Sequence, residues 1–136
     1  MVHTFQEIEH TADRAFTARG QDMRELFVHA AQAMFSLEPC DAHGPCRVWR
    51  EIEVAGSDRE TLLVNWLNDL LYFSERFQER YDSFEIVDFS DQHLRARLCG
   101  TGQVAPAATR VKAVTFHNLA IRHEGAEWTA TLVLDV

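Results

Sequence analysis

The sequence predicts an α+β fold, a two-layer α/β sandwich in which two amphipathic helices pack on one face of a mixed, mainly antiparallel sheet. Two segments carry apolar residues at the i, i+3, i+4, i+7 spacing of a helix. The other segments alternate apolar and polar residues, as strands with one solvated face do. Short turn sequences separate these segments, which favours hairpins. Helices with one apolar stripe each can cover a common sheet.

The first third of the chain predicts two strands followed by a helix. Residues 3–10 (HTFQEIEH) and 15–19 are short extended segments. The helical period then extends from Met23 to Leu37. Asp22 and Glu25 form a capping box at the start of this helix.

The middle third predicts one strand and a second helix. Residues 47–54 alternate, so one side of this strand is apolar and the other solvated. A wide apolar stripe follows from Leu62 to Phe77. Ser57 and Glu60 form a second capping box, and the helix is expected to run to about residue 80.

The last third predicts strands joined by turns. The extended segments are residues 84–86, 94–98, 111–117, 119–123 and 128–135. Turns at 90–93 and 124–127 join neighbouring segments into hairpins. The approximate element order is ββαβαββββ, in a single domain over residues 1–136.

Composition narrows the function classes. The chain has 136 residues, with 13 Lys and Arg against 21 Asp and Glu, a net charge of −8. Such a surface repels phosphate backbones, so direct high-affinity binding to nucleic acid, or to an anionic membrane, is not expected. No apolar stretch is long enough to span a bilayer and no signal peptide is evident, so we expect a cytoplasmic protein. The common phosphate-loop, zinc-protease and serine-hydrolase motifs are absent, which argues against an enzyme.

The loop CDAHGPC leaves two interpretations open. Cys40, His43 and Cys46 have a spacing that could hold zinc, but they offer only three ligands. The alternative is a surface loop with incidental thiols. Three cysteines without a secretion signal argue against a disulfide framework.

Asp13 and Asp135 are the acidic residues with the most unusual placement. Asp13 is expected in the turn after the first strand, and Asp135 ends an otherwise apolar strand beside Val136. If the first and last strands are neighbours, these oxygens converge and suit Ca²⁺, Mg²⁺ or Mn²⁺. The alternative is a turn aspartate bonded to its own backbone and a terminal aspartate that faces water. Lys112, the single lysine, could pair with a carboxylate or reach a phosphate, or lie on the open face of a strand.

Five motifs carry a resemblance to a known family. They are EHTAD at 9–13, ELFVHAAQAMF at 25–35, NWLNDLLY at 65–72, VKAVTFHNLAI at 111–121 and LVLDV at 132–136. With these motifs the sequence resembles the archease family from residue 5 to its C-terminus. The resemblance implies an accessory protein, not an enzyme, that activates RtcB-type RNA ligases in tRNA splicing and RNA repair. Those ligases join 5′-hydroxyl to 3′-phosphate ends with GTP and Mn²⁺, and the family promotes their guanylylation and multiple turnover. The alternative function is a chaperone-like modulator of tRNA-processing enzymes, such as a tRNA methyltransferase.

The resemblance also implies site residues. Asp13, Asp135 and the main-chain oxygen of Val136 match the metal-binding positions, for which Ca²⁺ or Mn²⁺ is expected and Mg²⁺ is a further option. Lys112 matches a lysine that is linked to activity. The expected partner is an RtcB-type RNA ligase. Our hypothesis is that the Asp13–Asp135 edge presents a metal-loaded acidic tip to the active site of this ligase. No catalytic residue is implied in this chain.

Overall fold

The computed structural model describes residues 5–9, 13–38, 46, 48–101, 111–116 and 119–136, with residues 5–9 and 13 described by their backbone. The helices are α1 (Met23–Ser36) and α2 (Arg59–Phe77). The strands are β1 (Phe5–Glu9), β2 (Asp13–Gly20), β3 (Val48–Ala55), β4 (Arg80–Phe89), β5 (His93–Thr101), β6 (Ala113–Thr115), β7 (Ile121–Glu124) and β8 (Glu127–Asp135). The expected α+β class is confirmed. Five strands follow α2, one more than in the approximate order expected from the sequence.

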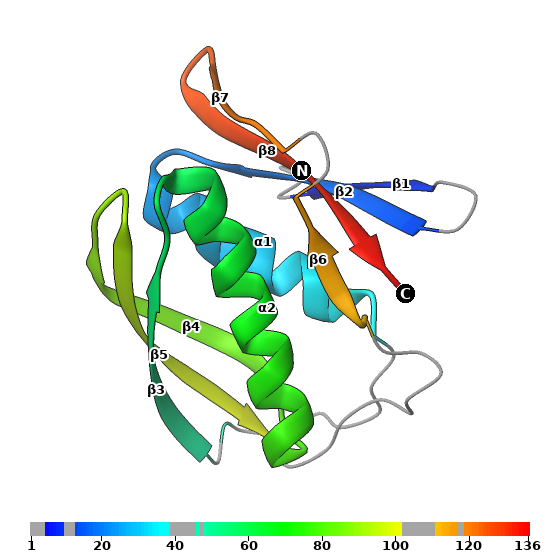
Figure 1. Cartoon of the computed structure of the whole chain (residues 1–136), viewed down its shortest axis with the longest axis vertical. Coiled ribbons are helices and arrows are strands. Elements are labelled where there is room, and N and C mark those ends of the chain that lie inside the picture. The colour runs from blue at the N-terminus through cyan, green and yellow to red at the C-terminus, as the bar shows by residue number, and fades with distance from the viewer. Residues whose placement is uncertain (1–4, 10–12, 39–45, 47, 102–110, 117–118) are drawn as a thin grey trace.

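The strands divide into two sheets instead of the single sheet expected from the sequence (Figure 1). One sheet has the order β1-β2-β8-β6, with β7 also paired to β8, and the other has the order β3-β5-β4. Every pairing among the described strands is antiparallel. Alternation along one strand shows that it has one buried face but not which strand lies beside it, so the division could not be seen in the sequence.

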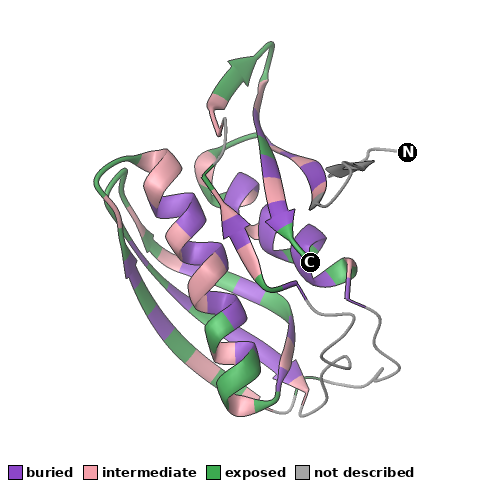
Figure 2. Cartoon of the chain, turned by 45° about the vertical axis from the view of Figure 1, so that its right-hand side comes forward, coloured by how far each residue is buried: buried purple, intermediate pink, exposed green. Residues whose placement is uncertain are grey.

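Both helices contact strands of both sheets. Helix α1 lies against β2 and β8 of the five-stranded sheet and against β4 of the three-stranded sheet. Helix α2 contacts β3 and β6. Figure 2 shows buried residues along the inner sides of the helices and alternating along the strands. Trp66 of α2 is fully buried and donates its indole N–H to the Phe27 carbonyl of α1 (3.0 Å), so the two helices are also joined by a hydrogen bond.

The helix ends confirm one predicted cap and correct the other. Asp22 caps α1 and accepts from the Glu25 amide at 2.8 Å, as expected. At α2 the cap is Asp58, which accepts from the Thr61 amide at 2.8 Å, and not Ser57. Both residue types cap helices well, so the sequence did not separate them. Helix α2 ends before the expected residue 80, because Gln78 adopts a left-handed conformation (φ 54°).

The predicted hairpins are confirmed. Strands β4 and β5 flank the turn at 90–92, and β7 and β8 are joined through residues 125–126. Gly125 has φ +62°, as the first central residue of a two-residue II′ hairpin turn requires.

No helix among the described residues has the length and apolar character that crossing a membrane requires.

Cys46 and Cys99 form a disulfide, contrary to the expectation of unpaired thiols. Their Cα atoms lie 5.5 Å apart, within the usual range for a disulfide. Cys99 is on β5 opposite Trp49 of β3, and it is fully buried. Because Cys46 is used here, it is not a ligand of the zinc clip considered for the CDAHGPC loop. Cys40 and His43 lie outside the described residues.

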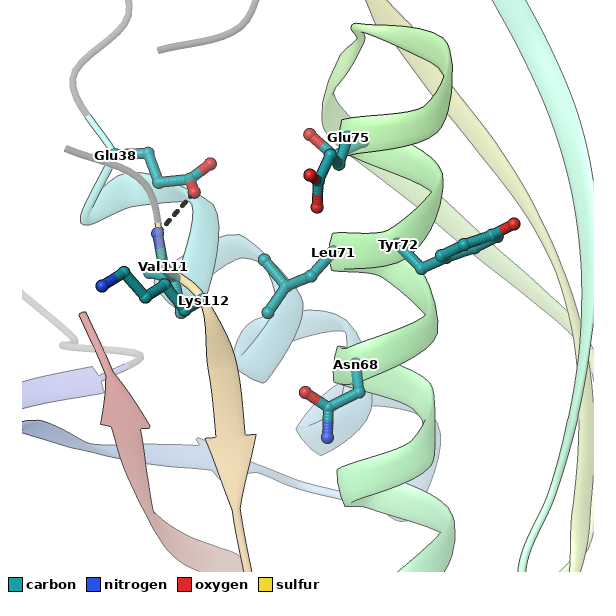
Figure 3. A pocket seen from close by; sticks show the side chains of 8 residues that line it. Glu38, Asn68, Leu71, Tyr72, Glu75, Val111 and Lys112 are labelled. Carbon is teal, nitrogen blue, oxygen red and sulfur yellow. Dashed lines mark hydrogen bonds between the residues drawn. The ribbon is translucent and has the colours of Figure 1, made fainter. Parts of the chain in front are cut away.

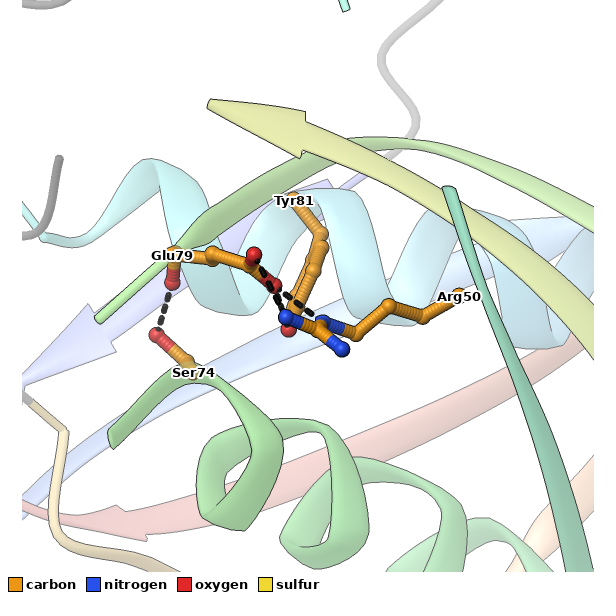
Figure 4. Close-up of polar contacts among 4 residues, drawn as sticks. All are labelled: Arg50, Ser74, Glu79 and Tyr81. Atoms are coloured by element: carbon orange, nitrogen blue, oxygen red, sulfur yellow. Dashed lines mark hydrogen bonds and ion pairs between the residues drawn. The ribbon is translucent and has the colours of Figure 1, made fainter. Parts of the chain in front are cut away.

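A partly buried ion pair joins the C-terminal end of α2 to the three-stranded sheet (Figure 4). Arg50 donates two hydrogen bonds to the Glu79 carboxylate (2.5 and 2.9 Å), which also accepts from the Tyr81 hydroxyl (2.8 Å). The Ser74 hydroxyl donates to the Glu79 carbonyl. The Arg50 hydrogen bond holds the pKa of Glu79 below its ordinary value, and burial raises the pKa of Tyr81. These contacts are structural and lie outside the residues predicted for function.

Candidate metal centre

Residues 13 and 135 lie side by side at one end of the five-stranded sheet. Asp13, the first residue of β2, is directly opposite Asp135, the last residue of β8. Ala113 of β6 is opposite Asp135 on the other side, so β8 is flanked by both strands at this end (Figure 1). Opposite Cα atoms in an antiparallel pair are about 4.5–5.5 Å apart. The backbone therefore brings together two acidic positions that are 122 residues apart in the sequence (135 − 13).

Two details of this arrangement differ from the expectation. Asp13 begins a strand and does not lie in a turn. The first and last strands are not neighbours, because β1 and β8 pair with opposite edges of β2. The predicted proximity holds nevertheless, since Asp13 belongs to the strand between them.

Lys112 is joined to the same end through its backbone. Its amide donates to the Asp135 carbonyl at 2.8 Å, immediately before β6 begins. The Lys112 side chain is exposed, as are Asp135 and Val136, the latter 44% exposed. This end of the sheet thus presents a cationic side chain and an anionic one to solvent on adjacent strands.

Two polar side chains hold the Lys112 segment in place (Figure 3). Glu38, two residues after the end of α1, is buried and accepts from the Val111 amide at 2.7 Å. Asn68 of α2 donates to the Val114 carbonyl at 3.0 Å and accepts from the Val114 amide at 2.8 Å. Asn68 therefore completes the edge of β6 as a neighbouring strand would. These contacts fix the backbone on both sides of Lys112.

A cavity of about 500 Å³ lies between α2 and this segment. Figure 3 shows Leu71 and Glu75 of α2 on one side and Glu38 and Lys112 on the other. The cavity adjoins the candidate metal centre without including Asp135 among its described lining residues.

Sequence reasoning missed Glu38 and Asn68. Asn68 interrupts the apolar stripe of α2 within the motif NWLNDLLY, which is a signal that a buried-side polar group needs a partner. The partner itself, 46 residues away, follows only from the fold.

The donor set fits a hard divalent cation. Carboxylate and main-chain oxygens are the ligands that Ca²⁺, Mn²⁺ and Mg²⁺ prefer. Among the residues whose side chains the structure describes, no group of three or more His, Cys, Asp or Glu gathers as a metal site. A centre here would therefore be built from the two aspartates and main-chain oxygen, as the resemblance implies, and not from a larger cluster.

Comparisons with known proteins show which family the sequence matches. The model of the "Archease protein family (MTH1598/TM1083)" matches residues 5–136. The protein archease of Methanopyrus kandleri is 34% identical over 139 residues, covering 97% of this chain and 99% of that protein, and that of Methanosarcina mazei is 30% identical, covering 97% and 95%.

Solved structures share the fold. The solution structure of Methanobacterium thermoautotrophicum protein 1598 aligns with a TM-score of 0.77 and 30% identity, over 98% of this chain and 99% of that one. A crystal structure from Thermotoga maritima, described as an archease and possible chaperone, aligns with a TM-score of 0.69 over both whole chains, and at 21% identity it supports the fold alone. With a family model that spans nearly the whole sequence and relatives of matching length, this chain belongs to the archease family.

Proposed function

We propose that this chain is a non-catalytic accessory protein that activates an RtcB-type RNA ligase in tRNA splicing or RNA repair. It promotes guanylylation of the ligase and multiple turnover. It acts through a divalent cation, Ca²⁺ or Mn²⁺ with Mg²⁺ as a further option, bound at the strand end by Asp13, Asp135 and the main-chain oxygen of Val136.

The observation that carries the proposal is the register of β2 and β8, in which residues 13 and 135 are directly opposite. Side chains of opposite residues in an antiparallel pair share one face of the sheet. Two carboxylates in such a position repel each other unless a proton or cation lies between them. The register supports a shared cation.

The chain's own residues supply position and charge. The backbone contacts of Glu38, Asn68 and Asp135 hold Lys112 at the strand end, where its compact ammonium can contact a phosphate. A bound cation supplies neutralisation of nucleotide phosphate charge. The net charge of −8 favours association with a basic, phosphate-binding cleft.

The test is guanylylation of the cognate ligase with GTP in the presence of this protein. We expect Asp13→Ala and Asp135→Ala each to lower the stimulation by on the order of tenfold or more, because each removes a ligand. Asp91→Ala is the matched control, since Asp91 is an exposed aspartate in the turn of the other sheet. Full stimulation by both strand-end variants would reject the proposal.

The chaperone-like alternative predicts control by exposed apolar side chains. Tyr72 and Phe116 are 59% and 49% exposed, and they lie on α2 and after β6. Single exposed aromatics are common on monomers and do not by themselves define a docking site. If Tyr72→Ser and Phe116→Ser abolished stimulation while both aspartate variants retained it, this alternative would replace the metal mechanism.

A further inference from the structure

A hollow of about 370 Å³ lies on the outer face of the five-stranded sheet, over β2, β8 and β7. It is formed by two sets of residues that lie opposite one another on neighbouring strands, and we call each set a row. Arg19 and Arg122 are both opposite Thr129, on its two sides, and Thr17 is opposite Thr131 in the next row. Because neighbouring strands are about 4.8 Å apart, the two arginine Cα atoms lie on the order of 10 Å apart. We call this surface the basic hollow.

The two arginines of the basic hollow differ in their partners from three other arginines of the chain, which form ion pairs. Arg50, Arg95 and Arg97 each contact a carboxylate. Arg19 and Arg122 have no ion pair among the residues that the structure describes. In a chain with a net charge of −8, two such guanidinium groups facing one hollow create a local site for an anion.

The hydroxyl groups add donors to this site. The Thr17 and Thr131 hydroxyls lie 2.8 Å apart, and whichever donates to the other leaves the second hydroxyl hydrogen available. His29 of α1 donates from Nδ1 to the Arg19 carbonyl at 2.6 Å, which holds the backbone of β2 at this row. Guanidinium and hydroxyl donors together are the groups that proteins use to bind phosphate oxygens.

The remaining lining residues restrict the class of ligand that the basic hollow could bind. Glu124 places a carboxylate at the hollow, which disfavours a bare polyphosphate but can accept a hydrogen bond from a ribose hydroxyl. Ala120 is the single apolar residue of the described lining, so this lining offers no aromatic side chain on which a base could stack.

We propose that the basic hollow binds the ribose–phosphate backbone of an RNA strand, with Arg19 and Arg122 on phosphate oxygens. The choice of RNA rests on the proposed function, because an accessory protein of an RNA ligase works beside that substrate. Thr129 and Asp135 lie on the same face of β8, six residues apart. The hollow is therefore about 20 Å from the candidate metal centre along the strand.

The expected binding is weak and depends on salt. The net charge of −8 repels a polyanion, so only the local contacts favour the complex. Two neutralised phosphates of a single strand give a slope of about −1.4 in log affinity against log salt concentration. Loss of one arginine should reduce this slope to about −0.7.

The experiment is an NMR titration of the isolated ¹⁵N-labelled protein with pentauridylate at 50–200 mM salt. We expect saturable shifts at Thr17, Arg19, Arg122 and Thr129. Arg19→Gln and Arg122→Gln should each weaken binding by about tenfold, because each removes a charge-assisted hydrogen bond.

The double variant Arg19→Gln/Arg122→Gln has its matched control in Arg95→Gln/Arg97→Gln, which makes the same charge change on the other sheet and should retain affinity within about twofold of wild type. Thermal unfolding of each variant checks that the fold is intact.

Three results would overturn the proposal: shifts confined to another face, unchanged affinity after loss of both hollow arginines, or equal binding of oligodeoxyuridylate or inorganic phosphate. The titration contains no ligase. It therefore tests RNA binding at the basic hollow independently of whether the protein stimulates guanylylation.

Discussion

Asn68 connects the stability of the fold to the geometry of the strand end, and the substitution Asn68→Ala tests this connection. Its side-chain amide makes two hydrogen bonds to the backbone of Val114, at 2.8 and 3.0 Å. Val114 is only 4% exposed, so water cannot readily replace these bonds. At about 1 kcal/mol for each bond, we expect a loss of about 2 kcal/mol in the free energy of unfolding.

Asn65→Ala is a control on the same helix. The Asn65 amide donates one exposed hydrogen bond, to the Ala55 carbonyl at 2.8 Å. Both substitutions raise helix propensity by the same amount, so this effect cancels in the comparison. We expect Asn65→Ala to cost about 0.5–1 kcal/mol.

Urea unfolding followed by tryptophan fluorescence measures both variants. For a domain of this size, the difference corresponds to a melting temperature about 4 °C lower for Asn68→Ala than for Asn65→Ala. Asn68→Ala should also weaken divalent cation binding several-fold, because β6 flanks Asp135. Equal stability and equal cation affinity of the two variants would refute the positioning role of Asn68.

Three further predictions concern the rest of the fold. Glu79→Gln should cost about 2 kcal/mol at pH 7, because Arg50 loses its partner. The pKa of Glu79 is lowered from 4.5 in the folded state, so the stabilising contribution of the ion pair is fully present above pH 4.5. This contribution is lost as the pH falls through the folded-state pKa of Glu79. Urea unfolding at a series of pH values should therefore show the stabilities of variant and wild type converging at low pH. Cys46→Ser removes a crosslink over 53 residues and should lower the free energy of unfolding by about 4 kcal/mol. Dithiothreitol should cause the same loss of stability in the wild type and no further loss in the variant. Gly100→Ala places a Cβ 2.3 Å from a main-chain oxygen and should cost about 2–3 kcal/mol in the free energy of unfolding. At Gly125 an added Cβ meets no atom within 4 Å, so Gly125→Ala should cost only about 1 kcal/mol, because of the positive φ. Thermal unfolding of the two variants compares these costs.

The local elements were predictable because their signals are local. The helical period and the Asp22 cap predicted α1, and the apolar stripe of α2 predicted its buried face. Ser57 and Asp58 are adjacent residues of types that both cap helices, so the sequence does not distinguish which of them begins α2.

Contacts between distant residues were harder to predict. The division into two sheets and the Cys46–Cys99 disulfide depend on which strands pair, and alternation does not contain that information. The proximity of Asp13 and Asp135 was anticipated from their placement after the first and at the end of the last extended segment, and the family resemblance marked both residues as well. The contacts of Asn68 and the facing arginines of the basic hollow had no such guide, and they follow only from the register.

Cation binding at the strand end is tested most directly by calorimetric titration of the purified protein with Mn²⁺ and Ca²⁺. From the register of β2 and β8 we expect one ion per chain, and we expect Asp13→Asn and Asp135→Asn each to lower the affinity by on the order of tenfold. Asp91→Asn should bind as tightly as the wild type. Undiminished affinity in both strand-end variants, or an affinity that changes with Asp91 alone, would contradict a cation shared between the ends of β2 and β8.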